Sequence, residues 1–549
     1  MFYQGPLYSK SKNLNDFNTS HLSNYFSGIV AYDNNDNSQA LKFFKSSKYL
    51  IKEHNSYLEN YINTLVLEGR TQHAASEIKK NLTKENSNFF EAHLLLALDS
   101  LKSENYKKSK KHLQNSYEFI NNDRLSLIIA ETLNQYLYVF EKNEIAKTKN
   151  KFGNFSFINE VFQRCYLDDK NTKLYFSNLI NSQNDGDYSR YIFFYLNYLL
   201  ENNDYELAKK ITDNLDYLNL SLLVSQAKKW IESKKTEEFK KVFSCSNPTD
   251  ITGEFFFLVS TLYSSQNNYE KSNFYLNISH YLNPKFKFNL SLLVENHYLK
   301  QDYRKTLKIL ESFDKNEEFY HWFKLKKEAQ IISKKKNKDR SLNFINLNFK
   351  KIKDPSIKII FDIANFNKGA KRYKEAIKYY DQIISKIDIN SQLYGEILYR
   401  RGGSYERLGD YANSDKDLLK SLEVNPDDAY ALNYLAYSWL ERKYKINQSL
   451  QMLEKAYAKK SNDPYIIDSI GWAYFLTNDY VKAESFLKRA VELMPEDPTV
   501  NDHYGDILWK LDRKIQARYF WKNVLNLEET EDEMKEDIKK KLIDGLTNS

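Results

Sequence analysis

Glycine and proline are scarce in this chain, whose 549 residues include only 14 glycines and 8 prolines. A protein built from many short strands needs these residues at its turns, so their scarcity favours long helices joined by compact connections. Apolar residues still make up 42% of the chain and aromatic residues 15%, which is enough to order most of its length. We therefore expect an all-α protein, organised as several domains or as one elongated array.

Cysteine is nearly absent as well. Cys165 and Cys245 are the only two, too few for a disulfide framework, and neither they nor the nine histidines show the spacing of a metal site. The sequence predicts two buried free thiols and no bound metal.

Long apolar runs are missing. The densest, at residues 191–200 and 254–263, have the length of buried helices, whereas a membrane span needs about twenty apolar residues. The first twenty residues hold no apolar core of signal-peptide length. As written, the chain is expected to be soluble and cytoplasmic, without a membrane span; a misassigned start codon would make it periplasmic.

Catalytic signatures are not found either. The most glycine-rich stretch, RRGGSYERLGD at 400–410, lacks the spacing of phosphate-binding loops, and no GxSxG or cysteine–histidine nucleophile pattern occurs. We predict no catalytic residue, no cofactor and no enzyme activity. The net charge of +8 is spread over 81 basic and 73 acidic residues, so nucleic acid is not an expected partner.

What the chain does contain is a spacing of 34 or 35 residues. Small residues recur at this interval at Gly402, Ala436, Gly471 and Gly505, and again at Ser414, Ser449, Ala483 and Ala517. Residues three, four and seven apart share one face of a helix, so each interval predicts two amphipathic helices that pack against each other. Gly471 and Ala483 would be small because the two helices approach closely there. Prolines at Pro426 and Pro495 would end the second helix.

This pattern resembles the tetratricopeptide repeat, and the C-terminal units match it most clearly. In residues 464–497 the motif positions fall on Ile467, Ile470, Gly471, Tyr474, Ala483, Leu487, Ala490 and Pro495. The resemblance implies a right-handed α-solenoid of antiparallel helix-turn-helix repeats. The segments NYLAYSW, DSIGWAYF and NDHYGDILWK look like a bacterial type of this repeat.

The expected organisation follows the strength of the match. Residues 1–20 form an N-terminal extension, 21–188 N-terminal repeats, 189–356 divergent central repeats with a hinge at 181–189 before them, 357–531 a C-terminal array, and 532–549 a polar closing helix. The C-terminal units are 357–390, 395–428, 429–463, 464–497 and 498–531. The number of repeats in 125–188 and 320–355 is left open.

The resemblance also implies a concave groove lined by first helices. Its groove positions map onto Tyr430, Asn433, Tyr437, Tyr465, Asp468, Trp472, Phe475, Asp502, Asp506 and Trp509. Aromatic rings and amides suit an extended peptide or a helix, and carboxylates would favour a basic one.

The sequence therefore predicts a non-enzymatic scaffold that binds a protein or peptide, with assembly of a bacterial envelope complex or another multiprotein complex as one candidate role. The alternatives are an RNA-binding helical repeat and an accessory array that recruits an enzyme. The partner's identity and the oligomeric state are left open.

Overall fold

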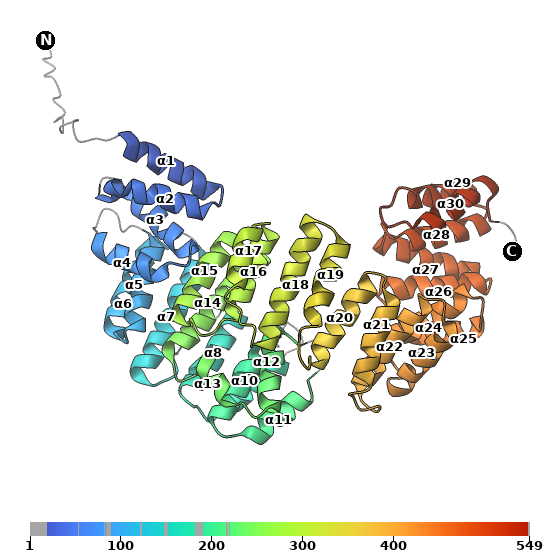
Figure 1. Ribbon diagram of the computed structural model, residues 1–549, viewed down its shortest axis with the longest axis horizontal. Helices are drawn as coiled ribbons and strands as arrows, with labels where there is room; N and C mark the ends of the chain where they lie inside the picture. Colours follow the sequence, from blue (N-terminus) through green and yellow to red (C-terminus); the bar gives the residue numbers. More distant parts are fainter. Residues whose placement is uncertain are drawn as a thin grey trace, which may run out of the picture. The chain divides into compact units, whose positions relative to one another are not determined.

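The computed structural model describes residues 19–52, 54–81, 83, 89–120, 123–147, 152–181, 190–215, 218 and 220–546 (Figure 1). Thirty α-helices and two short 3-10 helices account for its regular structure, and no strand occurs in the described ranges. The chain is therefore all-α, as predicted. The expected N-terminal extension lies outside the described residues up to position 18, and the expected hinge lies outside them from 182 to 189.

The chain divides into two compact units, Met1–Ile331 and Ile332–Ser549. The first contains α1 (Thr19–Asp33), α2 (Asn37–Ser46), α3 (Asn55–Leu67), α4 (Thr71–Asn81), α5 (Phe90–Lys102), α6 (Tyr106–Ser116), α7 (Arg124–Lys142), α8 (Asn154–Tyr166), α9 (Thr172–Asn181), α10 (Arg190–Glu201), α11 (Tyr205–Asp213), α12 (Leu222–Glu232), α13 (Glu237–Val242), α14 (Pro248–Ser265), α15 (Tyr269–Leu282), α16 (Asn289–Leu299), α17 (Tyr303–Leu310) and most of α18 (Glu318–Lys335). The 3-10 helices η2 (Lys48–Lys52) and η3 (Tyr117–Phe119) also belong to it.

The second unit is a row of hairpins. It contains α19 (Lys338–Phe349), α20 (Ile357–Gly369), α21 (Tyr373–Ile384), α22 (Gln392–Glu406), α23 (Tyr411–Val424), α24 (Ala429–Glu441), α25 (Ile446–Lys459), α26 (Pro464–Leu476), α27 (Tyr480–Leu493), α28 (Pro498–Lys510), α29 (Lys514–Val524) and α30 (Asp532–Asp544). Four of the five intervals expected in the C-terminal array contain one whole hairpin, and in the fifth, 395–428, the first helix α22 begins three residues earlier, at Gln392.

A left-handed turn residue marks each of these hairpins at the same place. In the second unit it is Lys371, Gly409, Lys443, Asn478 and Asp512, all with positive φ between 50° and 75°. The same turn joins the hairpins of the first unit at Asn35, Gly69, Glu104, Asn203, Lys234, Asn267 and Gln301. Six of these twelve residues are asparagine or glycine, which adopt this conformation most easily, so the position of the turn recurs even where its residue type has diverged.

The small residues of the second unit lie where the two helices of a hairpin touch. A side chain added at Gly471 would come within 2.8 Å of Leu487, and one at Gly505 within 2.5 Å of Trp521. At Gly402 it would lie 2.9 Å from Leu418. The alanines expected at these contacts, Ala436, Ala483, Ala490 and Ala517, are fully buried. Pro426 and Pro495 lie in the connections that follow α23 and α27.

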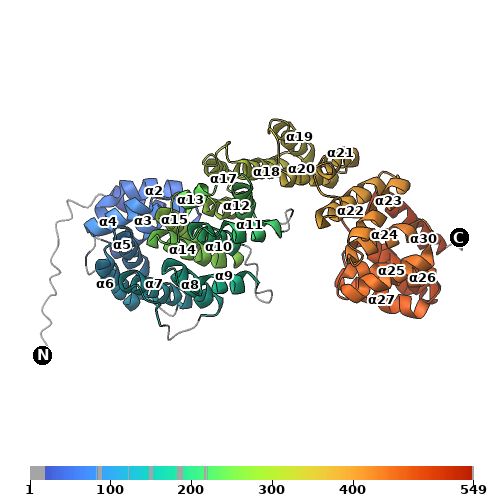
Figure 2. The same cartoon turned by 90° about the horizontal axis from the view of Figure 1, so that it is seen from below.

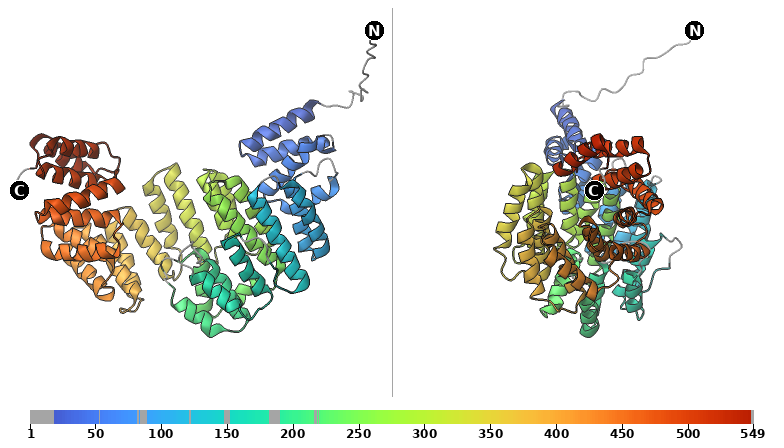
Figure 3. Two further views of the ribbon diagram at one scale, coloured as in Figure 1. Left: turned by 180° about the vertical axis from the view of Figure 1, so that it is seen from behind. Right: turned by 90° about the vertical axis from the view of Figure 1, so that its right-hand side faces the viewer.

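The hairpins of the first unit are not arranged in a simple row, because helices far apart in the sequence contact each other. Its hairpin α14–α15 contacts α3, α4, α5, α7 and α8, which lie far earlier in the chain (Figures 2 and 3). The threonine hydroxyl of Thr71 donates to the carbonyl oxygen of Asn277 at 3.4 Å, and the Tyr281 hydroxyl donates to Asp99 at 3.1 Å. Every residue of α14 from Ile251 to Phe257 is buried, so neighbours cover this helix on all sides.

The two cysteines correct an expectation. Cys165 of α8 and Cys245, just after α13, form a disulfide with their Cα atoms 5.5 Å apart. The prediction of two free thiols was wrong because 80 residues separate the cysteines in sequence, and only the folding of the first unit brings them together. Both are buried in its core.

Crossing a bilayer needs a long apolar helix, and none of the helices in the described ranges qualifies.

Candidate ligand groove

The groove positions predicted from the sequence lie on three successive first helices of the second unit. Tyr430, Asn433 and Tyr437 are on α24, the next four are on α26, and the last three are on α28. The side chains of Asp428, Asp463 and Asp497 cap the N-termini of these helices by accepting backbone N–H groups. This shared start fixes the register of the three helices, so equivalent residues line up from repeat to repeat.

Two tyrosines of this set have exposed rings, and the Nζ of Lys460 lies 4.9 Å from the ring centroid of one of them, Tyr430. Tyr430 is 46% exposed and Tyr465 is 60% exposed, and each is the second residue of its helix. Their rings therefore stand in corresponding places on consecutive repeats. Two large exposed aromatic rings so arranged are suited to burying apolar surface of a partner.

A stack of three rings lies toward the C-terminal end of α26. The Trp472 indole is 4.7 Å from the Phe475 ring and 4.1 Å from the His503 imidazole, measured between centroids, with planes inclined by only 8° and 9°. The Trp472 Nε1 and the Asn433 Oδ1 are buried atoms without a hydrogen-bond partner in the described part of the chain. Unpaired polar atoms of this kind are costly unless something else bonds to them.

His503 is held by a buried carboxylate. Its Nδ1 lies 2.9 and 3.1 Å from the two oxygens of Asp468, and both side chains are buried. Burial alone would lower the pKa of His503, but the negative charge and hydrogen bond of Asp468 raise it to about 9. The imidazole is therefore charged at neutral pH, and Asp468 is neutralised by it.

The carboxylates of Asp502 and Asp506 pair with a lysine of the closing helix α30. Lys541 of α30 places its Nζ 2.6 Å from Asp502 and 2.8 Å from Asp506. Asp506 also accepts a hydrogen bond of 2.9 Å from the Trp521 indole N–H. Burial, followed by the charge of Asp502, raises the pKa of Asp506 to about 7.

These pairs correct the expectation of an open acidic groove. Asp468, Asp502 and Asp506 were expected to face a basic ligand, but each is paired within the chain. Asp468 is paired by His503 of α28, whereas for Asp502 and Asp506 the reason is the end of the array: α30 packs Ile538 into the core and turns Lys541 inward, instead of presenting only polar residues to water. Trp509 also packs against this end, because Gly545 at the end of α30 lies directly on its ring.

A cavity of about 830 Å³ opens between the ends of the first helices and α30. Trp472, Phe475, Leu476 and Tyr480 give it an apolar side, and charged residues such as Lys443, Lys510 and Asp544 surround it. Trp472 and Phe475 belong both to this apolar side and to the ring stack. The cavity and the exposed tyrosines therefore lie along helices of the same array. In the described residues no cluster of three or more histidine, cysteine or acidic side chains is placed to hold a metal ion.

The tetratricopeptide repeat family matches residues 395–428, the hairpin α22–α23. A TPR repeat-containing protein of Pseudomonas aeruginosa is 33% identical over 110 residues, which are 20% of this chain and 18% of that protein. The chain therefore contains a tetratricopeptide repeat at residues 395–428.

Solved structures of tetratricopeptide-repeat proteins resemble parts of it. MamA from Desulfovibrio magneticus is 24% identical, with 32% of this chain and 97% of that chain covered and a TM-score of 0.27. A thermophilic TPR protein of Thermus thermophilus is 16% identical, with 34% and 99% covered and a TM-score of 0.30.

Sequence reasoning missed two residues of this tetratricopeptide groove. His503 follows the groove position Asp502 directly, and its role depends on Asp468, which lies one repeat earlier. Lys541 lies 35 residues after Asp506, which is one repeat length. That spacing was a usable signal, because it places Lys541 where the first helix of a further repeat would stack.

Proposed function

We propose that the protein is an interaction scaffold and that its C-terminal tetratricopeptide array binds a segment of a partner protein. The observation that carries the proposal is the pair Tyr430 and Tyr465, exposed at equivalent positions of consecutive repeats. Exposed aromatic rings in a repeat groove give a partner large apolar contact area at low conformational entropy. The cavity beside Trp472 and Phe475 would accept an apolar side chain of the same segment.

The charge preference of the groove differs from the one that the sequence suggested. A basic ligand would have to displace His503 from Asp468 or Lys541 from Asp502 and Asp506. Removing the partner of a buried charge is unfavourable. We therefore propose recognition through aromatic and apolar side chains, with backbone hydrogen bonds to groove amides, and no requirement for positive charge on the partner.

The disulfide supports a location. Disulfides persist in oxidising compartments such as the bacterial periplasm and are rare in the cytosol. The buried pair Cys165–Cys245 therefore favours a role in assembling an envelope complex over a cytoplasmic role.

The test compares two double variants in capture experiments from native lysate with mass spectrometry. Tyr430→Ala with Tyr465→Ala removes the groove rings. Tyr411→Ala with Tyr519→Ala removes two exposed tyrosines from the second helices α23 and α29 and serves as the matched control. We expect protein partners to be lost only from the groove variant. An identical set of captured proteins in both, or nuclease-sensitive RNA as the retained ligand, would refute the proposal.

A further inference from the structure

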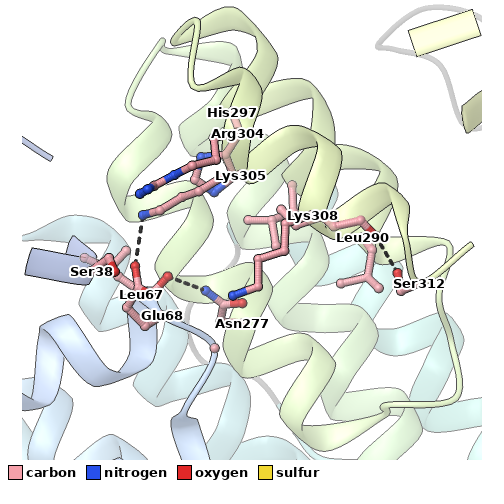
Figure 4. A pocket seen from close by; sticks show the side chains of 13 residues that line it. Ser38, Leu67, Glu68, Asn277, Leu290, His297, Arg304, Lys305, Lys308 and Ser312 are labelled. Atoms are coloured by element: carbon pink, nitrogen blue, oxygen red, sulfur yellow. Dashed lines mark hydrogen bonds and ion pairs between the residues drawn. The ribbon is translucent and has the colours of Figure 1, made fainter. Parts of the chain in front are cut away.

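A second opening lies in the first unit, remote from the C-terminal groove in sequence. It has a volume of about 520 Å³ and forms where the turn after α3 meets α15, α16 and α17 (Figure 4). Cavities of this size are typical of sites for small molecules. Because its walls come from segments more than two hundred residues apart, the opening exists only in the folded unit.

Three cationic side chains of one helix enter this opening. Arg304, Lys305 and Lys308 all belong to α17, and Figure 4 shows Arg304 and Lys305 extending toward Leu67 while Lys308 extends toward Asn277. Glu68 is the only acidic residue that lines the opening, and it pairs with Lys305 at 2.9 Å. Arg304 and Lys308 are exposed and form no ion pair with the described residues.

The electrostatic repulsion among these cationic side chains is unfavourable when no anion is bound. Arg304 and Lys308 are four residues apart on one helix, a spacing at which like charges repel. Burial, followed by the charge of Lys305, lowers the pKa of the neighbouring His297 to about 4, so this imidazole is neutral at pH 7 and adds no further positive charge. An anion in the opening would offset the repulsion.

The remaining lining residues indicate what kind of molecule would carry the negative group. Leu67, Leu290 and Leu293 form an apolar floor together with Ile309 of α17. The amide nitrogen of Asn277 donates to the carbonyl oxygen of Leu67 at 3.4 Å, and its amide oxygen lies on the side of Lys308 (Figure 4). An adjoining opening of about 370 Å³ shares Arg304 and Lys305 but also carries three carboxylates, so a negative group is better placed on the Lys308 side.

We propose that this opening is a binding site for a small amphiphilic anion, with its carboxylate or phosphate on Arg304 and Lys308 and its apolar body on the leucines. The site goes beyond the proposed groove function and shares no residue with it. Charge-assisted hydrogen bonds from an arginine and a lysine suit both head groups.

The test uses the full chain and four probes in isothermal titration calorimetry, namely octyl phosphate, octanoate, inorganic phosphate and octylamine. We expect at least one octyl anion to bind saturably and octylamine not to bind. Inorganic phosphate should bind with an affinity at least about tenfold lower than that of the octyl anion. The octyl anion that binds more tightly identifies the head group.

Two charge-matched variants locate the site. Arg304→Gln with Lys308→Gln should weaken the octyl anion by about tenfold or more, because two charge-assisted contacts are lost. Lys107→Gln with Lys111→Gln removes the same charge from an exposed face of α6 and should change the affinity by less than about twofold. The inference is overturned if neither anion binds saturably, if octylamine or inorganic phosphate binds as tightly, or if the Arg304/Lys308 variant binds normally.

Discussion

The imidazole of His503 lies flat against the indole of Trp472, with centroids 4.1 Å apart and planes 9° from parallel. Since Asp468 keeps this imidazole protonated, the contact joins a cation to the face of an aromatic ring. It connects α28 to α26, so the order of the groove depends on the charge of one side chain.

Stability of the second unit should therefore fall as pH rises through the titration of His503. The pKa of His503 is raised from 6.5 to about 9 in the folded chain, so its stabilising effect is complete below about pH 6.5 and lost as pH passes about 9. We expect a decrease of up to about 3 kcal/mol over this range, measured by urea unfolding followed by tryptophan fluorescence. His503→Gln should flatten the profile, and an unchanged slope in Asp468→Asn would contradict this account.

A glycine substitution tests the close approach within a repeat. Gly471→Ala places a methyl group about 2.8 Å from Leu487, and overpacking of this kind destabilises by about 1–3 kcal/mol. Gly369→Ala is the matched control, because a side chain there meets nothing within 4 Å. It should change the unfolding free energy by less than about 1 kcal/mol. Equal losses of unfolding free energy at both positions would mean that the contact with Leu487 is not the reason for a glycine at position 471.

The closing helix offers a test by paired substitution. Lys541→Met leaves the buried carboxyl of Asp506 with the Trp521 indole but without its counter-charge. Because the pKa of Asp506 is already raised to about 7 and the variant raises it further, the destabilisation of α28–α30 should be small at neutral pH and grow toward about 3–5 kcal/mol as pH rises. Native-state hydrogen exchange in these helices measures the loss. Adding Asp506→Asn removes the uncompensated charge and should restore most of the protection; a further loss in the double variant would show that Lys541 acts through something else.

Reduction of the disulfide should weaken the first unit. Cys165 and Cys245 close a loop with a sequence separation of 80 residues, and opening a loop of this size destabilises by about 2–4 kcal/mol. Thermal unfolding with and without a thiol reductant measures the effect, and the double variant Cys165→Ala with Cys245→Ala should not respond to reductant. Alkylation of both thiols in the folded, unreduced protein would contradict the pairing.

The repeat itself could be predicted from the sequence, because its determinants are local. Gly402, Gly471 and Gly505 are small for contacts made inside one hairpin, so the 34-residue spacing reports them directly. The disulfide, the contact of Thr71 with Asn277, and the pairing of Lys541 with Asp506 depend on how distant segments meet. Asp468 and Asp506 were placed on the right helices but assigned to an open groove for a basic ligand, since a helical pattern shows which face a residue occupies and not what covers that face.

The contact between Thr71 and Asn277 also has a consequence for synthesis of the chain. A sequence separation of 206 residues divides the two, and translation at about 5–20 residues per second takes about 10–40 s to cover it. During that interval α3 and α4 have left the ribosome while the hairpin α14–α15 that covers them does not yet exist. Helices α3 and α4 must wait, with apolar surface exposed, for a partner still being made, whereas each hairpin of the C-terminal array can dock on the one before it as soon as it emerges.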